Sequence, residues 1–264
     1  MKGIVLEPVE LAYLLATLHA TEVVGIEDPA LFPVDEATRA ATIEQGLQAL
    51  KDHGWLTPLP QPGQFNLNDL LVYAVAVIAD PQFVVFTIRN EAPGGSRLLL
   101  HYLAGADIVE LSTTADEKYA LALIPDRPTM LGRIGQLLGL SNVPDTSEIR
   151  FTIAKQDFEE LQDLAEGGQR EAAAGLLKRF GINGQSGDSL LAALESPQAN
   201  GLIVVARPNR GQIEAGRKAS VFRDSQVVWL AQRTDATSNT FSVETVQADT
   251  LPTVLDNYLQ FLSK

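Results

Sequence analysis

The three histidines of the chain, His19, His53 and His101, are the side chains best suited to acid–base catalysis or metal binding near neutral pH. A metal site needs several ligands at short spacing, and no two of these histidines lie close in the sequence. His19 and His53 fall near the predicted ends of helices, where an imidazole can interact with the helix dipole. His101 follows Leu100 on a predicted strand, and we expect it to be exposed or to lie at a sheet edge. The pattern favours structural roles and predicts no metal and no cofactor.

Motifs for nucleophilic catalysis and nucleotide binding are missing from the sequence. It has no cysteine, no Gly-x-Ser-x-Gly pattern and no phosphate-binding loop. Gly132, Gly135 and Gly139 lie inside a predicted helix and not at a strand-to-helix turn, so we expect them to allow close helix packing. The sequence therefore predicts no catalytic residue and favours a protein that is not an enzyme.

One group of basic residues stands out in this acidic chain. Arg207, Arg210, Arg217 and Lys218 belong to a segment in which Glu214 is the only acidic residue. Pro and Gly interrupt the segment, which predicts a hairpin loop of about ten residues. Such a loop is commonly a solvated, mobile surface element. The alternative is that its cations bind an acidic face of a protein partner, and these four residues are the candidate partner-binding site.

The composition is that of a globular protein and argues against several classes of partner. The 264 residues are 45% hydrophobic and 20% charged, with a net charge of −13. This negative field repels the phosphates of nucleic acids and anionic lipids, so we expect neither nucleic acid nor a membrane as a partner. The apolar run 70–79 is too short to span a bilayer, and the N-terminus does not resemble a signal peptide. We expect a cytoplasmic protein.

Hydrophobic periodicity predicts the elements that position these side chains. A strand at 3–6 precedes helices at 8–19 and 36–53, with Gly54 in a left-handed cap. The Pro-rich stretch 57–63 is predicted to be irregular, and Asn66 or Asn68 begins a third helix. Four segments of period two then predict an antiparallel meander, closed by a helix at 127–140. The predicted strands are 83–89, 97–103, 107–112 and 118–124.

The second part of the chain repeats this order of elements. Its predicted helices are 156–166, 169–180, 188–195 and 250–262, and its predicted strands are 151–153, 201–206, 218–223, 226–232 and 239–246. The helix end Lys51 to Gly54 corresponds to Lys178 to Gly181. We predict an α+β fold of an internally duplicated unit, 1–147 and 148–264, in one compact pseudo-two-fold body. The first unit has 8 Lys and Arg against 18 Asp and Glu, and the second has 12 against 15, so their net charges are −10 and −3.

Three phrases give this order a family resemblance. A Leu-x-x-x-Gly-Trp-Leu phrase ends the helix at 50–56, the next helix ends at Asp80-Pro81, and strands follow at 83–86 and 108–111. The order resembles the EspG family of ESX (type VII) secretion-associated proteins. The resemblance implies antiparallel sheet flanked by helical bundles, and a non-enzymatic cytosolic chaperone. Such a chaperone holds the tip of a helical secretion substrate, which in that family is a PE–PPE heterodimer. Few residues match, so no partner-contacting residue is carried over.

Three hypotheses follow. The first is a chaperone or adaptor that binds a helical protein partner and orients it with rim charges. The second is a small-molecule sensor or enzyme with a site between the two halves, which would show a polar pocket with perturbed carboxylates. The third is a structural homodimer with a self-complementary apolar patch.

Overall fold

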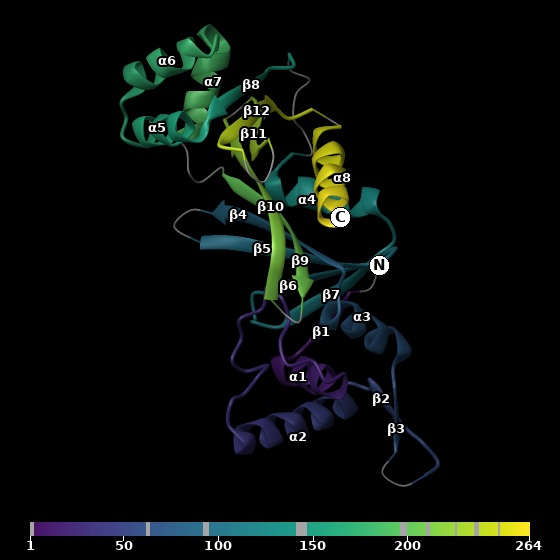
Figure 1. Cartoon of the computed structure of the whole chain (residues 1–264). Helices are drawn as coiled ribbons and strands as arrows, with labels where there is room; N and C mark the ends of the chain where they lie inside the picture. The colour runs from purple at the N-terminus through teal and green to yellow at the C-terminus, as the bar shows by residue number, and fades with distance from the viewer. Residues whose placement is uncertain are drawn as a thin grey trace. The chain divides into compact units, whose positions relative to one another are not determined.

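Figure 1 shows the computed structural model of the chain, which describes residues 3–61, 64–91, 95–140, 147–195, 200–209, 212–224, 226–234, 238–247 and 249–264. Its helices are α1 (Pro8–Thr17), α2 (Glu36–Asp52), α3 (Asp69–Ala79), α4 (Arg127–Leu138), α5 (Lys155–Glu166), α6 (Arg170–Arg179), α7 (Gly184–Leu194) and α8 (Thr250–Leu262). Its strands are β1 (Ile4–Leu6), β2 (Leu56–Pro58), β3 (Phe65–Leu67), β4 (Phe83–Glu91), β5 (Gly95–Ala104), β6 (Asp107–Thr113), β7 (Tyr119–Ile124), β8 (Arg150–Ala154), β9 (Gly201–Asn209), β10 (Gln212–Arg223), β11 (Val228–Arg233) and β12 (Thr240–Thr245). The predicted α+β class is confirmed.

The strand order repeats when it is counted from the two ends of the sheet. Within the described residues, the sheet has the order β1-β7-β6-β5-β4-β9-β10-β11-β12-β8, and β2 pairs separately with β3. β5 and β6 pair antiparallel, with Leu100 opposite Leu111, and β11 and β12 pair antiparallel, with Leu230 opposite Glu244. Each end of the sheet is thus a short strand that precedes helices in the chain, β1 or β8. Beside it lie the four strands of a meander in reverse chain order, β7 to β4 or β12 to β9. An internal duplication accounts for this repeat but stays a prediction.

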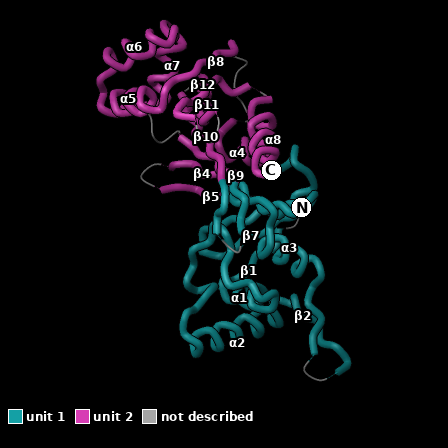
Figure 2. The backbone as a smooth tube through the Cα atoms, viewed as in Figure 1, with its two compact units in different colours: residues 1–85, 99–130, 206–215 teal, residues 86–98, 131–205, 216–264 magenta. Residues whose placement is uncertain are grey.

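The chain divides into two compact units that are not continuous in sequence. Unit 1 contains residues 1–85, 99–130 and 206–215, and unit 2 contains residues 86–98, 131–205 and 216–264 (Figure 2). The unit boundaries fall inside β4, β5, α4, β9 and β10. The predicted division into repeats at 1–147 and 148–264 stays a prediction.

Each unit has a largely aliphatic core, as expected from an aromatic content of 6%. In unit 1, α1 buries Leu11 and Leu15 completely, and the hydroxyl of buried Tyr102 donates to the Val24 carbonyl oxygen at 2.8 Å. In unit 2, Phe158 of α5 stacks on Phe241 of β12, with ring centroids 5.1 Å apart. Helix α2 packs along α1 in the lower part of Figure 1.

Capping residues fix where several helices begin. The Asp35 carboxylate accepts the Thr38 amide at 2.7 Å at the start of α2. Asn68 accepts the Leu70 amide at 3.0 Å at the start of α3, which decides between the two predicted starts. Each cap satisfies an amide that has no partner within its helix. Gly54 ends α2 with φ of +75°, which confirms the predicted left-handed cap.

The structure corrects three predictions. The stretch 57–63 was predicted to be irregular, but its first two residues belong to β2, where Pro58 lies opposite Phe65. Proline lacks a backbone amide, and a two-stranded ribbon, in which both strands are edge strands, tolerates that loss. Helix α7 begins at Gly184 and not at 188. The first turn contains glycines and has a low helix propensity, but Gly187 is buried against Ile182, and this packing outweighs the propensity. Gly132 was predicted to allow close packing of α4 on another helix. That prediction is wrong, because a Cβ at Gly132 would meet no described atom within 4 Å.

Candidate partner-binding site

The predicted basic residues lie on a pair of neighbouring long strands. β9 extends to Asn209 and β10 begins at Gln212, so the predicted loop of about ten residues is wrong. Positions 215, 217, 219 and 221 of β10 are buried or half-buried, while Glu214 and Lys218 on the other face are exposed, so the long charged side chains of the strand do not prevent it from continuing. Arg207, Arg217 and Lys218 are on these strands, and Arg210 lies outside the described residues.

Arg207 belongs to unit 1 and has an acidic neighbour. Its Nε lies 3.3 Å from Glu214 Oε2, and 35% of the Arg207 side chain is exposed. The carboxylate partly neutralises this cation, and an ion pair of this kind contributes little to stability. Ile213, which precedes Glu214, is 53% exposed. This part of β10 therefore presents an uncovered apolar side chain beside a compensated pair of charges.

Arg217 and Lys218 belong to unit 2, where helix α8 packs beside β10. The Arg217 guanidinium carbon lies 3.8 Å from the centroid of the Phe261 ring. The Tyr258 hydroxyl donates to the Lys218 carbonyl oxygen at 2.9 Å, which anchors α8 to the strand. Phe261 is 43% exposed and Lys218 is also exposed. This group combines two cations with an exposed aromatic ring, and aromatic residues and arginine are enriched in protein interfaces.

Phe261 was missed by sequence reasoning. α8 buries residues at helical spacing, namely Val254, Leu255, Tyr258, Leu259 and Leu262. Phe261 lies off this stripe, on the polar face of the amphipathic helix. An aromatic residue on a polar face was the sequence feature that could have marked it as a contact residue. Its partner Arg217 is distant in the sequence, and only the packing of α8 on β10 reveals the pair.

Two of the three histidines, His53 and His101, have carboxylate partners in unit 1. His19 lies just past the end of α1 with φ of +58°. His53 Nδ1 lies 2.7 Å from Oε1 of Glu10, a fully buried carboxylate whose other oxygen accepts the Glu7 amide at 2.8 Å. His101 is fully buried, with Nε2 3.2 Å from Glu110 Oε2, so the expectation of an exposed or edge position is wrong. β5 is an inner strand between β6 and β4, and its consecutive residues 100–103 are all buried, so both faces of the strand are covered there. Among the described residues, no three His, Asp or Glu side chains form a potential metal site.

Unit 2 contains a polar cavity of about 770 Å³. Its lining includes Arg170, which lies 2.6 Å from Glu195 and 3.6 Å from Asp188 and is thus neutralised. Ser189 Oγ accepts the buried Trp229 indole N–H at 3.2 Å. The described lining residues include serines but no histidine that could serve as their base, so they form no catalytic triad.

Among the described residues, two carboxyl groups have a lowered pKa, and both lie at helix starts and not in that cavity. Hydrogen bonds from Thr38 lower the pKa of Asp35, and hydrogen bonds from Thr129 lower the pKa of Asp126. Both carboxylates are exposed and act as caps. These shifts therefore have a structural cause and mark no acid–base site.

The fold is similar to that of the Mycobacterium tuberculosis type VII secretion system chaperone EspG5, whose structure was solved in complex with a PE25–PPE41 dimer. The similarity covers 96% of this chain and 94% of that chain, with a TM-score of 0.67 and 14% sequence identity. No protein-family model and no curated protein matches the sequence. The EspG-like fold expected from the order of elements is confirmed. Among the described residues, no helix is long and apolar enough to cross a membrane.

Proposed function

We propose that the chain is a non-enzymatic chaperone that binds a helical protein partner in the cytoplasm, as a type VII secretion-associated chaperone does. The observation that carries the proposal is the similarity of almost the whole fold to EspG5, a chaperone that was solved with a protein dimer bound. The absence of a serine–histidine pair in the described polar cavity also supports a role in binding over catalysis. The proposed partner is a helical protein with an acidic, partly apolar contact surface.

The proposed contact residues are Arg217, Lys218 and Phe261, with Arg207 and Arg210 as further candidates. Arg217 is held over the Phe261 ring, so the pair presents a positive charge and an apolar surface together at little further cost in side-chain entropy. An acidic helical partner would bring carboxylates to the cations and an apolar side chain to the ring. Charges at such a rim determine orientation and association rate more than affinity.

The test is capture of the native partner from a lysate of the source organism. We expect the wild-type chain to retain a helical protein and the variant Arg207→Glu/Arg210→Glu/Arg217→Glu to lose it. The melting temperature should change little, because exposed ion pairs and an exposed cation–π contact each contribute only about 0.5–1 kcal/mol. The control Arg97→Glu/Lys178→Glu/Arg233→Glu makes the same change in net charge at exposed positions and should retain the partner.

Two results would count against this site. If both triple variants capture the partner as well as the wild type does, Arg207, Arg210 and Arg217 do not contribute to binding. Loss of capture by both would assign the effect to net charge alone. A further variant, Phe261→Ala, leaves the charge unchanged and should weaken capture if the ring contacts the partner. Sedimentation of the purified chain tests the homodimer hypothesis separately.

A further inference from the structure

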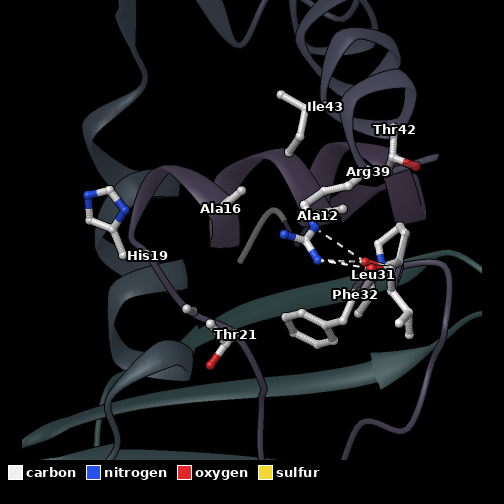
Figure 3. Close-up of a pocket in the computed structure, with 12 residues that line it drawn as sticks. Ala12, Ala16, His19, Thr21, Leu31, Phe32, Arg39, Thr42 and Ile43 are labelled. Atoms are coloured by element: carbon white, nitrogen blue, oxygen red, sulfur yellow. Dashed lines mark hydrogen bonds between the residues drawn. The ribbon is translucent and has the colours of Figure 1, made fainter. Parts of the chain in front are cut away.

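Unit 1 contains an apolar crevice between α1 and α2, with a volume of about 490 Å³ (Figure 3). The wall from α1 is formed by small side chains, and the wall from α2 by Thr42 and Ile43. Leu31 and Phe32 of the connecting segment close a third side, as the close-up shows. The complete lining is Ala12, Ala16, His19, Ala20, Thr21, Leu31, Phe32, Pro33, Val34, Arg39, Thr42 and Ile43.

The packing of the two helices explains why the crevice is open. The helices lie close together at Gly46, where an added Cβ would overlap the Val9 carbonyl oxygen and lie 2.8 Å from Tyr13 Cβ. Only Gly46 and Leu50 of α2 are buried, so no residue between Gly46 and the start of the helix is buried, and Ala40 is exposed. Opposite this part of α2, α1 offers only Ala12 and Ala16, which are too short to fill the space.

Apolar surface at this site is left uncovered. Val34 is 94% exposed although it lines the crevice, and it has the highest exposure among the large apolar side chains described. The Arg39 side chain lies against the backbone of Pro33 and Val34. The Arg39 side chain donates to the Pro33 carbonyl oxygen at 3.2 and 3.3 Å and to the Val34 carbonyl oxygen at 3.3 Å. Val34 extends the apolar lining of the crevice to the surface, and contiguous exposed apolar surface is a feature of binding sites.

The surrounding charges identify the kind of partner. Four exposed acidic residues lie within two positions of lining residues in the chain: Glu22, Asp35, Glu36 and Glu44. Arg39 is the only Lys or Arg between positions 19 and 44, and it is engaged with the two carbonyls. This field disfavours an anionic ligand and a second copy of this chain, whose net charge is −13. A partner with basic residues around an apolar side chain is electrostatically complementary.

We propose that this crevice is a second docking site, which binds an amphipathic segment of a protein partner whose apolar side chain is flanked by Lys or Arg. The apolar side chain enters between Ala16 and Ile43 and contacts Val34. The flanking cations face Glu36 and Glu44. The site is independent of the basic strands and takes a partner surface of opposite charge.

The test uses two synthetic helical peptides with the same leucine pattern, one with lysine and one with glutamate on the flanks. Calorimetry measures binding, and amide chemical shifts locate it on the isotope-labelled full chain. We expect the lysine peptide to bind, to shift amides within 12–21 and 31–43, and to bind more weakly as salt is added. The glutamate peptide should not bind.

Two single substitutions provide the matched comparison. Ala16→Phe fills the crevice and should weaken binding of the lysine peptide about tenfold or more, since it displaces one buried apolar side chain. Ala41→Phe adds the same ring to an exposed position of α2 that does not line the crevice and should leave binding unchanged. The variant Arg207→Glu/Arg210→Glu/Arg217→Glu should bind this peptide as the wild type does. The peptide assay therefore tests the crevice alone, and the capture experiment tests the proposed function alone.

Several results would overturn the proposal. These are equal binding of both peptides, no binding of the lysine peptide, shifts confined to other residues, and equal effects of the two Phe substitutions. Dimerisation that Ala16→Phe abolishes would instead assign the crevice to a second copy of the chain.

Discussion

Buried tyrosine hydroxyls are the clearest pH-sensitive groups at the scale of single residues. Burial is the main cause that raises the pKa of Tyr102, Tyr119 and Tyr258, because it disfavours the charged phenolate. The Tyr119 hydroxyl also donates to Asp28 at 2.7 Å, which opposes loss of its proton. A pKa that is higher in the folded than in the unfolded chain stabilises the fold below the unfolded pKa of about 10. That contribution is lost as the pH rises above about 10 toward the folded pKa values.

We therefore predict that the free energy of unfolding decreases above about pH 10, and that phenolate absorbance develops at higher pH in the native chain than in the guanidinium-unfolded chain. A spectroscopic pH titration of both forms, with urea unfolding at each pH, measures the two effects. Tyr119→Phe should reduce the alkaline loss of stability, because the group that ionises there is gone. Coincident titration curves for native and unfolded chains would contradict the assignment.

At the scale of elements, helix α2 shows what a periodic pattern does and does not determine. Its apolar residues Ala40, Ile43, Leu47 and Leu50 recur at helical spacing, which is the pattern of a helix with one apolar face. The structure confirms the helix but buries only Gly46 and Leu50. Periodicity identifies a helix, whereas the distance to its neighbour depends on the side chains of α1. The crevice could therefore not be predicted from α2 alone.

Gly46 gives a testable consequence of this packing. Gly46→Ala should lower the free energy of unfolding by about 1–3 kcal/mol, because the added methyl group forces the helices apart and overpacks the contact. Urea unfolding measures the change. The control Gly175→Ala, inside α6, meets no described atom within 4 Å and should raise stability by about 0.5–1 kcal/mol through helix propensity. A Gly46→Ala chain as stable as the wild type would show that the helices separate without cost.

Strand prediction succeeded where alternation was clear and failed where composition resembled a loop. The meander strands β4 to β7 were predicted within a few residues, because apolar residues alternate and short turns separate them. The outer parts of β9 and β10 contain Pro, Gly and charged residues, which favoured a loop. Pairing of the two strands outweighs these local preferences. Arg217 and Lys218 were identified by charge, but their neighbour Phe261 depends on a tertiary contact that no local pattern encodes.

At the scale of the whole molecule, the order of elements carries more information than residue identity. The EspG-like fold was expected from that order and is confirmed at 14% sequence identity. A fold survives substitution of core residues by others of similar size and polarity, so its pattern persists after residue matches are lost. Contact residues have no such constraint. The partner-binding residues therefore remain proposals drawn from this chain's own charges and exposed side chains.

Each compact unit contains residues from both sides of position 147, so neither unit can form from one predicted repeat alone. Within unit 2, the Asn90 amide donates to the Asn200 carbonyl oxygen at 3.0 Å. A Cβ at Gly201 would overlap Leu138 Cδ2, so α4 packs directly on the start of β9. The proposed repeats 1–147 and 148–264 thus contact each other through β4, α4 and the start of β9.

We predict that fragments 1–147 and 148–264, produced separately, do not unfold cooperatively, because each leaves β4 or β9 as an unpaired strand edge. Mixed during refolding, they should form a one-to-one complex whose circular dichroism matches that of the full chain. The control is the full chain with a protease site inserted between 147 and 148 and cut after folding, which should remain associated. A cooperative thermal transition of isolated 1–147 would show instead that the first repeat is an independent domain, and the duplicated halves would then be structurally separable.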